Sequence, residues 1–159
     1  MKKIVLFLAL SIMTATFGYA QSQAELKIKE IVKKYEKTNG VECMVLSKGI
    51  RLGLVKMALN EQIGKDIMKG VTCITIINYS DADQNTCAEI NTDIDCFKSI
   101  LKAFDSDNNK ESDKNENTKA FAAVSDDGTI SDLIFLSEDK ETKMVMHMAG
   151  HIKVTDIQQ

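Results

Sequence analysis

The last third of the chain holds three apolar runs joined by short polar connections, and this pattern restricts the possible folds more than any other feature. The runs are 120–124, 130–136 and 142–151. The connection at 125–128 reads Ser-Asp-Asp-Gly, which is typical of a tight turn, and the one at 137–141 is equally short. Because such short connections join neighbouring antiparallel strands, the sequence predicts a three-stranded antiparallel meander.

Two further strands are predicted at 41–46 and 71–79, where β-branched and apolar residues dominate. The second run is apolar on both faces, which indicates a buried strand. Between them, 50–59 is apolar on nearly all sides and predicts a buried helix, and 60–70 predicts a short helical turn. A strand, helix and strand over this length would allow a parallel, right-handed crossover. Gly49 and Gly53 in this segment form a G-x-x-x-G pair, which we interpret as a site where the helix packs closely on the sheet. The alternative, a helix-dimer face within a membrane, is disfavoured because the segment is too short to span a bilayer.

Two amphipathic helices are expected in the sequence, one before and one after these two strands. Ser22 and Glu25 form a capping box for the first helix, which Asn39-Gly40 ends. Thr86 and Glu89 form a second capping box, followed by apolar residues at alternating steps of three and four. The first apolar stripe is Ala24, Ile28, Ile31, Val32 and Tyr35, and the second is Cys87, Ile90, Ile94, Phe97, Leu101 and Phe104. The second stripe predicts one continuous helix to residue 104.

The expected fold is therefore α+β in two layers. A sheet of about five strands, ending in the antiparallel meander, would carry three helices packed on one face. Residues 21–159 form a single domain of ordinary size. Residues 105–117 contain no apolar side chain, so they predict a solvated, flexible loop within it.

The first twenty residues have the order of a cleavable export signal. Lys2 and Lys3 precede an apolar run at 4–12, and small residues at 18 and 20 precede Gln21. The apolar run is shorter than the roughly 20 residues that span a bilayer. We therefore predict cleavage between Ala20 and Gln21, a periplasmic or secreted location, and no stable membrane insertion.

Composition argues against nucleic acid as a partner. The chain has a net charge of −3 and one arginine, Arg51, whereas nucleic-acid binding needs a basic face.

An oxidising compartment permits disulfides among Cys43, Cys73, Cys87 and Cys96. Cys87 and Cys96 are too far apart to pair in a continuous helix. A Cys43–Cys73 bridge is reachable if the two strands align, and two buried thiols are the alternative.

Residues 105–116 contain the best-spaced candidate metal ligands. Asp105, Asp107, Asn109, Asp113 and Glu116 follow the ligand spacing of a calcium-binding EF-hand loop. Lys110 occupies the position that needs glycine, and the following segment is predicted as strand rather than helix. A bare solvated loop is the alternative interpretation.

The last predicted strand offers a second candidate. Met144, Met146 and Met148 alternate along it, and thioether sulfur with His147 and His151 would suit Cu(I). Alternation is equally typical of a strand's core face, and His147 would point away from the methionines. A zinc pair of His147 and His151 would need a bulge at Gly150, because four strand residues span roughly 13 Å.

No catalytic motif is present: the chain lacks G-x-S-x-G, C-x-x-C and a cysteine adjacent to a histidine. Cys43 and Cys73 lie in apolar strands, which favours inert thiols. We therefore expect neither catalytic residues nor a bound cofactor.

Four segments resemble the exported bacterial proteins grouped as domain of unknown function family 4252. They are 41–50, 70–77, 131–137 and 144–150, reading VECMVLSKGI, GVTCITII, SDLIFLS and MVMHMAG. The resemblance implies an exported protein of Gram-negative cells, encoded beside envelope-signalling genes, with no assigned reaction and no site residues to transfer. We expect a non-enzymatic binding domain of the cell envelope, whose partner is another envelope protein or a small ligand. The alternatives are a metal-binding exported protein, calcium before copper, and then an enzyme.

Overall fold

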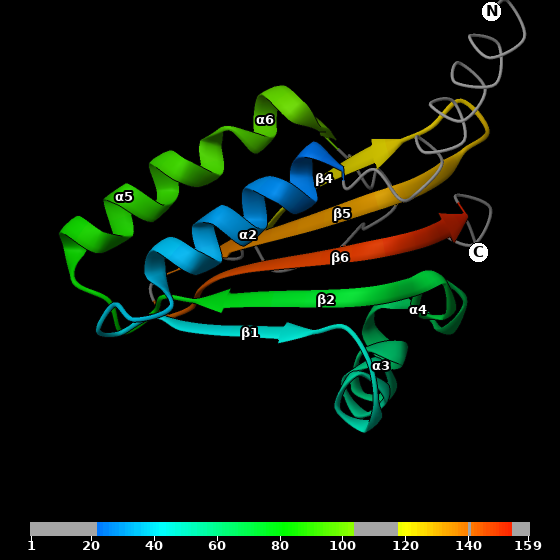
Figure 1. The fold of residues 1–159 in the computed structure, drawn as a ribbon, viewed down its shortest axis with the longest axis horizontal. Helices are drawn as coiled ribbons and strands as arrows, with labels where there is room; N and C mark the ends of the chain where they lie inside the picture. The colour runs from blue at the N-terminus through cyan, green and yellow to red at the C-terminus, as the bar shows by residue number, and fades with distance from the viewer. Residues whose placement is uncertain (1–21, 104–117, 140, 154–159) are drawn as a thin grey trace, which may run out of the picture.

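The computed structural model describes residues 22–103, 118–139 and 141–153, which form a six-stranded sheet with helices on both faces (Figure 1). The predicted α+β class is confirmed. The helices are α2 (Gln23–Tyr35), α3 (Ile50–Ile63), α4 (Lys65–Gly70), α5 (Gln84–Asp95) and α6 (Phe97–Ile100). The strands are β1 (Glu42–Leu46), β2 (Val71–Asn78), β3 (Lys102–Ala103), β4 (Thr118–Val124), β5 (Thr129–Glu138) and β6 (Lys143–Lys153).

The strand order is β1-β2-β6-β5-β4-β3, and every pairing is antiparallel. The C-terminal meander of β4, β5 and β6 is confirmed. The predicted parallel crossover between the first two strands is not formed. The strands β1 and β2 are antiparallel, with Leu46 opposite Ile74 and Glu42 opposite Asn78. The connection between these strands consists of two helices, α3 and α4, which turn back beside the sheet and return the chain in the opposite direction.

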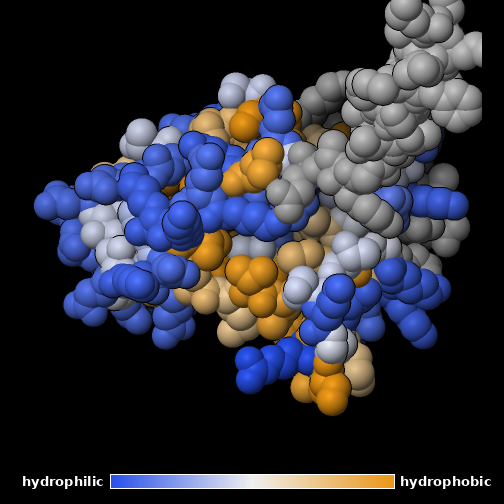
Figure 2. Space-filling model, viewed as in Figure 1, coloured by the Kyte–Doolittle hydropathy of each residue, from blue (hydrophilic) through white to orange (hydrophobic). Residues whose placement is uncertain are grey.

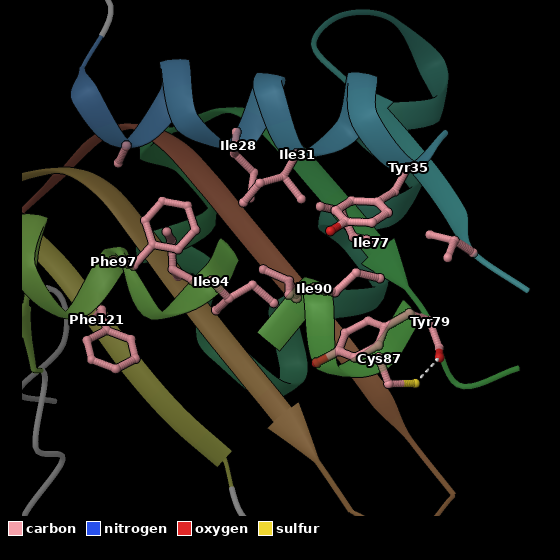
Figure 3. Close-up of a cluster of buried hydrophobic side chains, with 14 of the residues drawn as sticks. Ile28, Ile31, Tyr35, Ile77, Tyr79, Cys87, Ile90, Ile94, Phe97 and Phe121 are labelled. Atoms are coloured by element: carbon pink, nitrogen blue, oxygen red, sulfur yellow. Dashed lines mark hydrogen bonds between the residues drawn. The ribbon is translucent and has the colours of Figure 1, made fainter. Parts of the chain in front are cut away.

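One face of the sheet carries α2, α5 and α6 and contains the larger core (Figure 3). The predicted start of α2 is confirmed, since Ser22 is the N-cap and its Oγ accepts a hydrogen bond from Glu25 N at 2.9 Å. Ile28 and Ile31 of α2 pack toward Ile90 and Ile94 of α5. The buried side chains of this core are Ala24, Ile28, Ile31, Tyr35, Val41, Ile77, Tyr79, Cys87, Ile90, Ile94, Phe97, Leu101, Phe121, Ile134 and Val145.

The long helix predicted to residue 104 is shorter and broken. Its N-cap is Asp83 rather than Thr86, because the Asp83 carboxylate accepts the N–H groups of Asn85 and Thr86. The helix α5 ends at Asp95, α6 adds one turn, and Leu101 is already extended. Local periodicity favoured a continuous helix, but pairing of β3 with β4 draws the chain into the sheet. Ile90, Ile94, Phe97 and Leu101 are buried as predicted, and Phe104 lies outside the described residues.

The opposite face of the sheet carries α3 and α4. Successive residues of β2 point to opposite faces, so Ile74 packs with the α3 side and Ile77 with the α2 side. We had expected the helix predicted at 50–59 to share a face with the other two helices. That expectation is wrong, because α3 lies on the opposite face. The physical reason is the composition of β2, which is apolar on both faces and needs cover on each. This second core contains Leu46, Leu52, Ile67, Met68, Val71, Ile74, Ala122, Ile130, Leu133, Met148 and Ile152.

The prediction that residues 50–59 form a fully buried helix is wrong for the outer side of α3. Leu52 is buried, but Ile50, Leu54 and Met57 are 83%, 60% and 68% exposed. Gly53 is exposed, and a Cβ at Gly49 or Gly53 would meet no atom, so the two glycines do not mediate close packing. Because α3 lies at the margin of the sheet, it buries one side only, and no described residue covers the other.

Candidate functional site

Asp132 and His147 form a buried polar pair on the α2 side of the sheet. They lie on the adjacent strands β5 and β6, with exposures of 1% and 0%, and Asp132 Oδ1 lies 2.9 Å from His147 Nε2. Polar groups buried this deeply destabilise a fold unless they are hydrogen-bonded. The partners of each atom therefore decide what the pair can do.

Three donors surround the Asp132 carboxylate. Besides His147, Ser22 Oγ donates to Oδ1 and Ser131 Oγ donates to Oδ2, both at 2.7 Å. Burial acts to raise the pKa of Asp132, but hydrogen bonds from His147, Ser22 and Ser131 outweigh burial and hold that pKa below its usual value. The group is therefore a carboxylate at neutral pH. Since Ser22 also caps α2, the carboxylate ties the start of that helix to the sheet.

The second ring nitrogen of His147 is unpaired: Nδ1 is buried and has no hydrogen-bond partner among the described residues. Because Asp132 is ionised, Nε2 carries the proton that it donates. In the neutral ring Nδ1 then bears a lone pair and acts as an acceptor. Buried acceptors in folded proteins are nearly always paired, so a buried acceptor without a donor is unusual.

His147 lines a cavity of about 110 Å³ between α2 and the strands β1, β2 and β6. The accessible surface inside the cavity is mostly apolar, and its wall includes Ile28, Val32 and Val45. Val45 is 52% exposed, and Figure 2 shows apolar surface between α2 and β1 on the face turned toward the viewer. An engineered aliphatic cavity of about 150 Å³ holds benzene, so this one accommodates a group of a few heavy atoms.

Cys73 and Thr75 of β2 also line this cavity, so a cysteine lies in the same cavity wall as the histidine that bonds Asp132. Burial raises the pKa of the Cys73 thiol, and a hydrogen bond with Thr75 opposes that effect without cancelling it. No hydrogen bond among the described residues joins Cys73 to His147. A thiol with a raised pKa is mostly protonated at neutral pH and is then a weak nucleophile.

The four cysteines are free thiols. Cys43 lies opposite Ile77, four residues from Cys73 on β2, which corresponds to roughly 13 Å along the strand. The strand register therefore excludes the Cys43–Cys73 bridge that the sequence left open. Burial also raises the pKa values of the Cys43 and Cys96 thiols.

The candidate calcium ligands Asp105, Asp107, Asn109, Asp113 and Glu116 lie outside the described residues. The three methionines alternate on β6 as expected, and Met146 and Met148 belong to the second core. Met148 is fully buried there and Met146 packs against it, whereas His147 lies on the opposite face. The structure therefore does not bring the three methionines and His147 together as copper ligands.

The two histidines of the candidate zinc pair lie in different environments. His147 is buried and bonded to Asp132, while His151 is exposed. Within the part of the chain that the structure describes, no three His, Cys, Asp or Glu residues form a group that could hold a metal ion.

Sequence reasoning missed the pairing of Asp132 with His147. Each stands within an otherwise apolar strand, Asp132 in ISDLIFL and His147 in MVMHMAG. A charged residue in a strand's apolar run, beside a histidine in its neighbour, is a signal that could have found the pair. A register shift between Ile130 and Asp132 sets the face on which the carboxylate lies, and that shift is not visible in the pattern.

A family model described as "Domain of unknown function (DUF4252)" matches residues 35–159. The chain belongs to the DUF4252 family. The DUF4252 match contains Cys73, Asp132 and His147 and begins at the last residue of α2, so Ser22 precedes it. No curated protein and no solved structure matches the chain.

Proposed function

We propose that this DUF4252 protein is an exported, non-enzymatic binding domain of the cell envelope, and that its ligand inserts an apolar group with one hydrogen-bond donor beneath α2. The observation that carries this proposal is that His147, whose buried Nδ1 has no hydrogen-bond partner among the described residues, lines this cavity. A hydroxyl or amine of the ligand would supply the missing donor. The ligand is a small molecule or a side chain of another envelope protein.

The surroundings of His147 support binding rather than proton transfer. Asp132 fixes the orientation of the ring through Nε2, which leaves the Nδ1 lone pair directed by the protein rather than by solvent. The cavity wall includes two cations and two anions from α2 and its C-cap residue, namely Lys29, Lys33, Glu25 and Glu36. Because these charges are balanced, the site favours a neutral group over a charged one.

A direct test uses isobutanol, which combines a branched apolar body with a single hydroxyl donor. In a ¹⁵N nuclear magnetic resonance titration, we expect saturable shifts at Val45, Cys73 and the His147 ring nitrogens. The Nδ1 resonance should move most, because its lone pair gains a partner. Shifts that stay linear with concentration and spread over the whole surface would contradict the proposal.

Two matched variants locate the binding. Val45→Asp places a charge in the wall of the cavity and should abolish the saturable shifts. Leu26→Asp changes an exposed residue of α2, 49% accessible, that does not line the cavity, and it should leave the shifts unchanged. Equal behaviour of the two variants would place binding elsewhere. Affinity capture from the native envelope, with Val45→Asp as the reference bait, would then identify the natural partner.

Export is tested separately from binding. Mass analysis of the protein from an envelope fraction should find Gln21, or its cyclised form, as the first residue. An intact Met1 in that fraction would contradict the cleavage that we propose. The helices among the described residues include none that is long and apolar enough to cross a membrane.

The calcium alternative is tested by calorimetry. Our proposal predicts no heat from residues 105–116, given Lys110 at the position that needs glycine. Calcium binding that disappears in Glu116→Gln would favour the metal-binding alternative instead.

A further inference from the structure

The outer side of α3 is an apolar ridge with no partner in the described chain. The ridge consists of Ile50, Leu54 and Met57, spaced by four and three residues and therefore on one side of the helix. All three are more than half exposed. Apolar side chains grouped in this way on a folded surface mark an interaction site more often than isolated exposed residues do.

The segment around this ridge is basic, in contrast to the chain as a whole. Residues 47–70 contain five Lys or Arg residues and two acidic residues, a local charge of +3 in a chain whose net charge is −3. Lys48 and Arg51 are exposed beside the start of the ridge, and Arg51 is the only arginine of the protein. Glu61, one turn beyond Met57 on the same side, is the one acidic side chain that continues the ridge.

The ridge is convex and lies at the margin of the molecule. Figure 1 shows α3 beyond β1, and Figure 2 shows apolar surface at this margin with hydrophilic surface beside it. A protruding apolar ridge flanked by cations matches the boundary between lipid headgroups and acyl chains, where apolar side chains enter and cations face phosphates. With 14 residues, α3 is too short to span a bilayer, and its buried side is already packed on the sheet.

We propose that α3 docks the folded domain on an anionic phospholipid surface. Ile50, Leu54 and Met57 enter the headgroup boundary, while Lys48 and Arg51 face the lipid phosphates. This docking goes beyond the ligand binding proposed above and uses the opposite face of the sheet from the His147 cavity. The helix lies on the membrane and does not cross it.

Vesicle flotation tests the proposal. The chain is expressed with its own leader and recovered from the envelope, and mass spectrometry establishes that all variants share one N-terminus. We expect binding to vesicles of phosphatidylglycerol and phosphatidylethanolamine, about tenfold weaker binding to phosphatidylcholine vesicles, and loss of the difference at high salt. Absence of binding to the anionic vesicles would overturn the proposal.

Variants of the ridge separate it from the rest of the surface. Leu54→Ser combined with Met57→Ser should weaken binding by at least about tenfold, because two apolar side chains no longer enter the lipid. Glu61→Lys should strengthen binding by roughly fivefold, since it adds a cation beside the phosphates. Leu26→Ser removes an exposed apolar side chain from α2 and should bind as the wild type does.

Two outcomes would remove the assignment. The first is equal binding by the wild type and the double serine variant, which circular dichroism should show to be folded because both positions are exposed. The second is a dimer, seen by light scattering, that the double serine variant dissociates. That result would assign the ridge to a second copy of the chain instead of a membrane.

Discussion

The helices α2 and α3 have nearly the same length and lie on opposite faces of one sheet, yet their outer sides differ. Around the buried Ile28 and Ile31, α2 exposes mainly charged side chains. In contrast, α3 buries Leu52 and exposes Ile50, Leu54 and Met57. The comparison teaches that a helix which is apolar all round need not be enclosed, since one side can pack on the core while the other stays exposed.

The two helices also differ in how polar groups hold them. The start of α2 is tied to the sheet because Ser22 and His147 both form hydrogen bonds with Asp132. On the other face, Lys56 Nζ of α3 donates to the carbonyl of Val71 at 2.8 Å. We therefore expect changes on the α2 side to cost more stability than changes on the α3 side.

The largest effect is expected from Phe97→Ala. Phe97 is fully buried in the core beneath α2, so its removal should lower the free energy of unfolding by about 3–5 kcal/mol. Urea denaturation measures the change, and Leu26→Ala is the exposed control, expected within about 0.5 kcal/mol of the wild type. Similar values for the two variants would mean that this face is not packed as described.

Asp132→Ala should follow, with a loss of about 2–4 kcal/mol at neutral pH. The substitution leaves the buried His147 Nε2–H without an acceptor and frees the hydroxyls of Ser22 and Ser131. Asp132→Asn, which keeps an acceptor oxygen in place, should lose less. Denaturation of the two variants side by side distinguishes a lost hydrogen-bond acceptor from simple loss of volume.

A pH profile of stability sharpens the same point. The pKa of Asp132 is lower in the folded chain than in the unfolded chain, where it is about 3.9. The stability contributed by the ionised Asp132 carboxylate is therefore present above about pH 4. It is lost as the pH falls through the folded-state pKa. Thermal unfolding of Asp132→Asn should lack this part of the acid destabilisation, whereas Leu54→Ser should keep it. Parallel profiles for the wild type and Asp132→Asn would argue against an ionised carboxylate.

The polar ties of the two helices can be compared through Ser22→Ala and Lys56→Met. Ser22→Ala removes both the cap of α2 and a hydrogen bond to Asp132, and it should cost about 1–2 kcal/mol. Lys56→Met keeps the aliphatic stem and loses one bond to Val71, so we expect a loss below about 1 kcal/mol. A larger loss for Lys56→Met would reverse the comparison between the helices.

The smallest effect is expected from Leu54→Ser on the ridge of α3. Because Leu54 is exposed, its replacement should change the free energy of unfolding by less than about 0.5 kcal/mol. The measurement is the same urea titration. A loss above about 2 kcal/mol would show that the ridge is covered by part of the chain and is not available to a membrane.

The sequence by itself determined the features that depend on neighbouring residues. The turn at 125–128 and the apolar runs around it specified the meander, and the spacing of Ser22 and Glu25 specified the start of α2. The apolar pattern at 71–79 specified a strand buried on both faces. These signals are local, because hydrogen bonding within a turn or cap and the period of side-chain directions act over a few residues.

Only the tertiary structure decided the features that depend on distant residues. It placed β2 antiparallel to β1, ended α6 where β3 joins β4, and left one side of α3 uncovered. It also brought Ser22 to Asp132, 110 residues away, and set His147 in the cavity wall. A periodic pattern states that a side needs cover but not what provides it, and the pairing of buried polar groups depends on strand register, which the whole sheet fixes together.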